Sequence, residues 1–170
     1  MSIKKGPWTV VGTKSIYKNP WMNVREDKVV RPDGKDGIYG IVAIKPGVTV
    51  LPVEQYRYTT ESKTIEAVSG RIEDNESALN AGKRELKEES GIEAKEWINL
   101  GIVFPMTTII ESKNYLFLAK DLTFSGANPD GTENFKLIKI SLDQAIEWIM
   151  EDKITSSVTA TILFKVKNLL

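Results

Sequence analysis

The sequence predicts an α+β (mixed α/β) domain, and three observations lead to that class. Strand-like segments rich in Val, Trp and Tyr fill the N-terminal part, and one strong helical pattern follows them. Further strand-like segments then precede two C-terminal helical patterns. A chain of 170 residues has the usual size of one domain. We therefore expect a single domain over residues 1–170, with a strand region at 1–45.

Five strands are expected before the central helix. The turn sequence Arg31-Pro32-Asp33-Gly34 and the dipeptide Pro46-Gly47 separate some of them. Alternating or continuous apolar runs place the strands at 8–16, 22–30, 39–44, 48–53 continuing to 58, and 64–68.

The central helix is expected to begin at Asp74 or Asn75 and to end at Gly91. Its apolar positions lie at i, i+1, i+4 and i+8, which makes one stripe at helical period: Ala78, Leu79, Gly82 and Leu86. Asp74 is a plausible N-cap, and Gly91 suits the left-handed conformation that often follows a helix.

Strands and two helices are expected after the central helix. The strands are placed at 100–104, 115–119 and 135–140, with a long loop at 125–132. Ser141 is expected to cap a helix at 142–150, and Thr155 or Ser156 the last helix, which carries Val158, Ile162 and Val166 on its inner face.

Composition excludes several classes of function. Lys plus Arg and Asp plus Glu both number 23, so the chain lacks the basic excess that binders of nucleic acids or membrane surfaces usually carry. Cys and His are absent, which removes disulfides, thiolate or imidazole metal sites and Ser-His-Asp catalysis. No apolar stretch reaches the roughly 18 residues of a membrane span and no leader pattern is visible, so we expect a soluble, cytoplasmic protein.

Three glutamates gather near the end of the central helix. Glu85, Glu88 and Glu89 stand at i, i+3 and i+4, so their carboxylates share one face. Negative charge near a helix C-terminus costs roughly 0.3 to 1 kcal/mol of stability per group. The alternative interpretation is a solvated acidic face, which would carry this cost with no compensating interaction. A divalent cation would relieve the repulsion, and Mg²⁺ or Mn²⁺ suits oxygen ligands better than Zn²⁺. Gly70, in the preceding loop, would let backbone carbonyls approach the ion.

The spacing around these glutamates resembles a known motif. Gly70, five residues, Glu76, seven residues and then Arg84-Glu85-Leu86-Lys87-Glu88-Glu89-Ser90-Gly91-Ile92 match the Nudix box, residues 70–92, at every fixed position. The resemblance implies the Nudix fold, an α/β/α sandwich around a mixed β-sheet. It also implies metal-dependent hydrolysis of a nucleoside diphosphate linked to another moiety.

The resemblance also assigns roles within the motif. Glu85 and Glu89 match the principal metal ligands, and Glu88 matches a further ligand or a group that orients water. Arg84 matches the arginine that holds these glutamates in place. The other matched roles are backbone ligation by the Ser69 carbonyl and structural support from Gly70, Glu76 and Gly91.

Further segments resemble the ADP-ribose and nucleotide-sugar pyrophosphatase branch of this family. They run nearly from end to end of the chain: 19–21, 31–34, 55–58, 66–70, 115–119 and the C-terminal helical pair. In that branch Arg57 would contact the substrate diphosphate or a glutamate partner, and Glu66 would support the substrate. Arg71 and Glu111 are further candidates for substrate contact, and the N-terminal strands would help to build a homodimer.

The late loop of this branch usually supplies a general base or another metal ligand. Here it offers Asp130 and Glu133, and we place the base at Glu133, with Glu85 or Glu88 as alternatives. The chain departs from the branch at 65–70, which lacks the usual Trp and Pro. It departs again at 105–111, which replaces a Ser-Pro-Gly turn.

We therefore expect a diphosphatase that releases a nucleoside monophosphate and a sugar phosphate from ADP-ribose or a nucleotide sugar. Two alternatives stay open: a non-catalytic sensor of nucleotide metabolites, and a nucleoside triphosphate pyrophosphohydrolase. Simpler interpretations also stay open for single residues: Arg57 as a surface charge, Glu66 as half of an ion pair, and Glu111 as a solvated loop charge.

Overall fold

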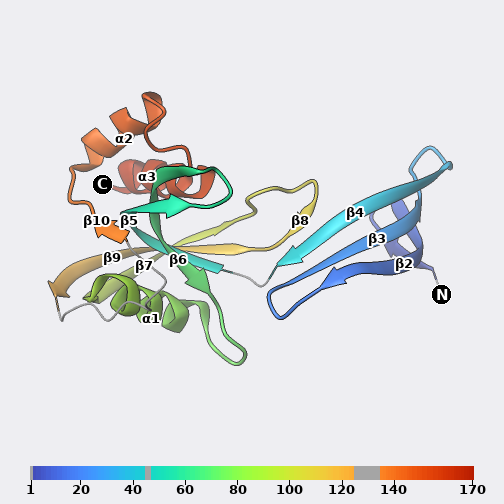
Figure 1. Cartoon of the computed structure of the whole chain (residues 1–170), viewed down its shortest axis with the longest axis horizontal. Helices are drawn as coiled ribbons and strands as arrows, with labels where there is room; N and C mark the ends of the chain where they lie inside the picture. Colours follow the sequence, from blue (N-terminus) through green and yellow to red (C-terminus); the bar gives the residue numbers. More distant parts are fainter. Residues whose placement is uncertain (1, 45–46, 125–134) are drawn as a thin grey trace. The chain divides into compact units, whose positions relative to one another are not determined.

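The computed structural model describes residues 2–44, 47–124 and 135–170. The chain divides into two compact units, residues 1–45 with 104–112 and residues 46–103 with 113–170. Figure 1 shows the elements of both units. The long loop expected at 125–132 lies outside the described residues, and the single domain over 1–170 stays a prediction.

The first unit is a sheet with the strand order β1-β2-β3-β4-β8. Strands β1 to β4 are antiparallel, and the short β8 lies parallel to β4. The expected turn joins β3 to β4, with Gly34 at φ 80° and its N–H donating to the Arg31 carbonyl at 2.9 Å. A homodimer built by these strands stays a prediction. The bounds are β1 Ile3–Lys5, β2 Trp8–Lys18, β3 Met22–Val30, β4 Asp36–Ile44 and β8 Ile110–Glu111.

The second unit contains a mixed sheet with the order β10-β5-β9-β7, and β6 pairs with β5. Strand β9 lies parallel to β5 at residues 47–49, while the other pairs are antiparallel. Strands β7 and β9 extend well beyond the expected segments, and β10 is shorter than expected. The bounds are β5 Gly47–Arg57, β6 Ser62–Arg71, β7 Ile92–Val103, β9 Asn114–Phe124 and β10 Phe135–Leu137.

Three helices are described: α1 Ala78–Ser90, α2 Leu142–Met150 and α3 Ser157–Leu169. Their N-caps are Ser77, Ser141 and Ser156, each of which accepts a backbone N–H from the first turn. The expected cap at Asp74 is therefore wrong, while Gly91 ends α1 in the left-handed conformation at φ 67°, as expected. Among the described residues, none of the helices is long and apolar enough to cross a membrane.

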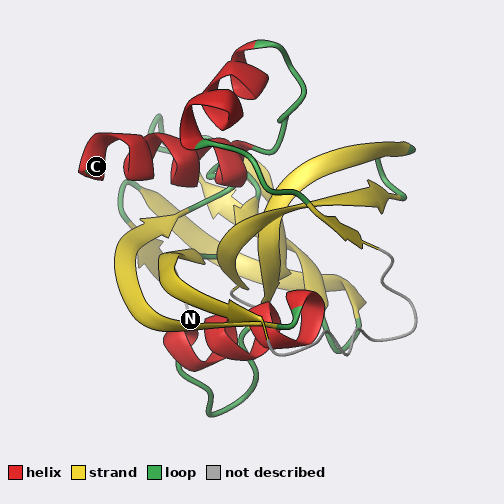
Figure 2. Cartoon of the chain, turned by 90° about the vertical axis from the view of Figure 1, so that its left-hand side faces the viewer, coloured by secondary structure: helices red, strands yellow, loops and turns green. Residues whose placement is uncertain are grey.

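The hydrophobic core of the second unit lies on both faces of its sheet. Phe117 of β9 packs with Ala81 of α1, whereas the neighbouring Leu116 is fully buried with Ile162 of α3. Successive strand residues face opposite sides, so α1 covers one face and α3, with α2 packed on it, covers the other (Figure 2). This arrangement confirms the expected α/β/α sandwich.

Candidate active site

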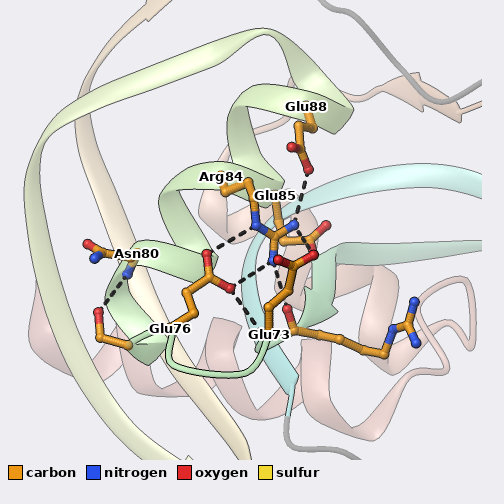
Figure 3. Close-up of polar contacts among 8 residues, drawn as sticks. Glu73, Glu76, Asn80, Arg84, Glu85 and Glu88 are labelled. Carbon is orange, nitrogen blue, oxygen red and sulfur yellow. Dashed lines mark hydrogen bonds and ion pairs between the residues drawn. The ribbon is translucent and has the colours of Figure 1, made fainter. Parts of the chain in front are cut away.

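Arg84 of α1 finds an acceptor for each of its N–H groups (Figure 3). Nε and Nη2 donate to the two carboxylate oxygens of Glu76 at 3.1 and 3.0 Å. Nη2 also donates to the Arg71 carbonyl at 2.9 Å. Nη1 donates to Glu85 at 2.8 Å and to Glu88 at 3.1 Å. A planar guanidinium with five donors so engaged has a fixed position, and it joins the β6–α1 connection to the helix.

Glu76 is the main partner of this guanidinium. The hydrogen bonds from Arg84 hold the pKa of Glu76 below its usual value, and the Glu73 N–H, which donates to Glu76 at 3.1 Å, acts in the same direction. The bonds to Glu76, followed by those to Glu85 and Glu88, raise the pKa of Arg84. Both groups of the central pair are therefore charged at neutral pH.

Gly70, near the end of β6, lies directly against the Glu85 carboxyl group. A Cβ placed on Gly70 would lie 1.8 Å from Glu85 Cδ and 2.0 and 2.2 Å from its two oxygens. Real Cβ contacts essentially never fall below 3.0 Å, so only glycine fits at position 70 while the Glu85 carboxylate has this orientation. The glycine that opens the motif thus makes room for one of its glutamates.

The three helix glutamates differ in their surroundings. Glu89 is buried, and the side chain of Glu85 is 14% exposed, whereas that of Glu88 is 55% exposed. A buried glutamate is rare unless it has partners, so this face is not the solvated acidic surface of the alternative interpretation.

These glutamates suit a metal ion by the chemistry of their oxygen donors and not by their present geometry. Within the described part of the chain, no three acidic side chains converge closely enough to hold an ion as they lie. Glu85 and Glu88 instead both bond to Nη1 of Arg84 (Figure 3). Their oxygens are the ligands that Mg²⁺ and Mn²⁺ prefer. The residues therefore fit such an ion in kind, and binding requires at least one carboxylate to rotate.

A second charged pair lies on the hairpin formed by β5 and β6. Arg57 Nε and Nη2 donate to the two oxygens of Glu66 at 3.1 and 2.9 Å, and the Thr64 hydroxyl donates to Glu66 at 2.6 Å. Burial raises the pKa of Glu66, but these hydrogen bonds outweigh it, and the pKa lies below its usual value. The Arg57 side chain is 38% exposed. Thr64 is not among the predicted residues, although residues i and i+2 of a strand share a face.

We expect the Arg57–Glu66 pair to make folding stability depend on pH. Because folding lowers the pKa of Glu66, its contribution is complete above the ordinary value of 4.5 and is lost as the pH falls through the folded-state pKa. Thermal unfolding between about pH 7 and pH 3 should therefore show a smaller loss of Tm for Glu66→Gln than for wild type. Glu96→Gln, which removes an exposed carboxylate paired with Lys120, is the control. Equal pH slopes for Glu66→Gln and wild type would contradict this assignment.

The remaining predicted residues are spread over both units. Ser69 lies in β6, next to Gly70, and the exposed Arg71 contributes its carbonyl to the arginine of α1. Glu111 belongs to the first unit, where its carboxylate lies 2.7 Å from Arg25 Nη1. Glu133, like the whole loop at 125–132, lies outside the described residues. The substrate and catalytic roles of these residues stay predictions.

Two family models match this chain. Residues 8–42, from β2 into β4, match the nucleoside diphosphate sugar hydrolase N-terminal domain. Residues 37–156, which include the motif around α1, match the NUDIX domain. The chain belongs to the Nudix family. The resemblance based on the motif is thereby confirmed, and with it the expectation of a Nudix hydrolase.

Individual relatives align with most of the chain. A methanol dehydrogenase activator of Bacillus methanolicus is 28% identical, with 88% of this chain and 86% of that protein aligned. An ADP-ribose pyrophosphatase of Bacillus subtilis (strain 168) is 20% identical, with 88% and 87% aligned. A CMP-5'-(N-acetyl-N-hydroxy-3-aminopropyl)phosphonate hydrolase of Streptomyces rubellomurinus (strain ATCC 31215) is 23% identical, with 95% and 83% aligned.

A solved structure shares the whole fold. The crystal structure of an ADP compounds hydrolase superposes with a TM-score of 0.86 at 20% sequence identity. The match covers 99% of this chain and 97% of the other. The Nudix fold expected from the motif is therefore confirmed.

Proposed function

We propose that this Nudix protein hydrolyses the diphosphate linkage of a nucleoside diphosphate derivative, with ADP-ribose or a nucleotide sugar as substrate. The observation that carries the proposal is the place of Glu85, whose carboxylate lies over Gly70 and is held by Arg84 within the matched NUDIX domain. The relatives named for ADP-ribose and for a CMP-linked phosphonate support this substrate class.

The carboxylates of α1 are the proposed cation ligands. Glu85, Glu89 and the Ser69 carbonyl would hold Mg²⁺ or Mn²⁺, joined by Glu88 once it leaves Arg84. When bound, such an ion neutralises diphosphate oxygens and lowers the pKa of a bound water. Arg84, anchored on Glu76, keeps Glu85 beside Gly70.

The hairpin pair is the proposed contact to the substrate. Arg57 would donate to a phosphate oxygen, because a guanidinium fork matches phosphate geometry. Glu66 holds that guanidinium through two of its donors and so limits its orientation. Arg71 and Glu111 stay proposed as further substrate contacts.

A carboxylate must take the proton of the attacking water. Glu88 is one candidate, because its side chain is exposed near the end of α1. Glu133 of the late loop is the other candidate. Attack at one phosphorus then gives a nucleoside monophosphate and a sugar phosphate.

A substrate panel tests the proposal. Purified protein is incubated with ADP-ribose, nucleotide sugars, dinucleotides and nucleoside triphosphates, each with Mg²⁺, Mn²⁺ or EDTA, and the products are separated by chromatography. We expect AMP and ribose 5-phosphate from ADP-ribose, or the corresponding pair from a nucleotide sugar, and no product with EDTA. Release of pyrophosphate from triphosphates alone would contradict the proposal. Tight binding in calorimetry without any product would contradict it as well, and would indicate a sensor.

A further inference from the structure

A helix, rather than another strand, satisfies a backbone donor of β6. Within the described ranges, β6 pairs with β5 alone. Ala67 of β6 is 2% exposed, and its N–H donates to the hydroxyl oxygen of Thr159 at 2.9 Å. Thr159, in the first turn of α3, is itself only 1% exposed. Because a buried donor without an acceptor is costly, this hydroxyl takes the place of a strand carbonyl.

The Thr159 hydroxyl is held in one orientation by the cap of α3. It donates to Ser156 Oγ at 3.0 Å, and Ser156 Oγ also accepts the Thr159 backbone N–H at 3.3 Å. A hydroxyl has one hydrogen, so this donation leaves its lone pairs for Ala67. The helix cap and the strand contact therefore form one continuous chain of hydrogen bonds.

Strand β6 carries two groups that the proposed reaction needs, on either side of this contact. Glu66, directly before Ala67, holds the guanidinium of Arg57. Gly70, three residues after Ala67, lies beneath the carboxyl group of Glu85. Any shift of the backbone at Ala67 would move Glu66 first, since it is the adjacent residue.

We infer that Thr159 is a positioning residue for the diphosphate site, acting through the backbone of β6; this inference rests on the proposed function. Thr159 itself touches neither Arg57 nor Glu85 through any described hydrogen bond; its side-chain bonds go to Ala67 and Ser156. Loss of the hydroxyl removes a hydrogen bond one residue from Glu66 and three residues from Gly70, while both residues keep their pairing with β5. Substrate binding is therefore affected more than the catalytic step.

Matched substitutions on α3 test this role. Thr159→Val keeps the shape of the side chain but removes the acceptor, and Thr159→Ser keeps the hydroxyl. Thr161→Val is the control, because the Thr161 hydroxyl donates to the Ser157 carbonyl within the same helix, at 2.8 Å. Thr159→Val should raise KM by about threefold to tenfold, the size of one lost hydrogen bond, and by more than it lowers kcat. Thr159→Ser should have a KM close to that of wild type.

Amide hydrogen exchange supplies a readout that does not depend on turnover. The Ala67 amide should exchange slowly in wild type, Thr159→Ser and Thr161→Val, and faster in Thr159→Val. Fast exchange of Ala67 in wild type would overturn the inference even if Thr159→Val does not fold. Equal KM values for Thr159→Val and Thr161→Val, with only Tm lowered, would reduce Thr159 to a stabilising residue. If wild type cleaves no compound of the panel, the proposed function fails, while exchange still decides whether Thr159 holds β6.

Discussion

Glu85→Gln should fold normally and lose about 10³-fold in kcat. The neutral amide has the shape of the carboxylate and keeps its place over Gly70, but it no longer supplies the charge that a divalent cation needs. Steady-state kinetics on the best compound of the panel measures the loss. Circular dichroism and Tm verify that the fold is kept.

The matched control for this variant is Glu93→Gln. Glu93 lies at the start of β7, its side chain is 51% exposed, and its partner is Lys87 at 2.5 Å. This substitution removes the same charge close to the end of α1 and should leave turnover near that of wild type. Turnover of Glu85→Gln at the level of Glu93→Gln would show that the Glu85 carboxylate has no part in the reaction.

Gly70→Ala should also keep the fold and lose about 10²-fold in kcat, the usual cost of a catalytic group displaced by about 1 Å. The added methyl group would lie 1.8 Å from Glu85 Cδ, so the carboxyl group must move. The atoms that clash belong to the far end of a flexible side chain, and rotation of that side chain relieves the clash with little loss of stability.

Gly40→Ala is the control for the added methyl group. Gly40 lies in β4 with no atom within 4 Å of a Cβ built on it. Both alanine variants should keep a Tm close to wild type, and only Gly70→Ala should lose activity. A kcat for Gly70→Ala within about threefold of wild type would mean that the contact with Glu85 does not matter for the reaction.

The ends of α1 show where local sequence is sufficient for prediction and where it is not. Gly91 was identifiable because few other residues adopt a positive φ at low cost. The N-cap was not, since Asp74, Asn75 and Ser77 all have side chains suited to capping. In the structure the Glu76 N–H donates to the Glu73 carbonyl and Asn75 has φ 67°, so residues 73–76 form a turn before the helix and Ser77 is the cap.

The candidate site was predictable in its residue types but not in its contacts. The spacing of the glutamates placed them on one helix face, as the structure has them. Burial of Glu89 and the bonds from Arg84 to Glu76 and to the Arg71 carbonyl depend on how residues outside α1 pack against the helix, which the spacing of the glutamates does not reveal. Thr159 lies 92 positions from Ala67 in the chain, so no local pattern could have connected them.

The central claim is that the glutamates of α1 gather around a divalent cation. Anomalous diffraction from crystals grown with Mn²⁺ tests it most directly. The account predicts a manganese peak within about 2.5 Å of oxygens of Glu85 and Glu89 in wild type, and a weaker or absent peak in Glu85→Gln. A wild-type crystal without that peak, in which Glu85 and Glu88 both remain bonded to Arg84, would contradict the account.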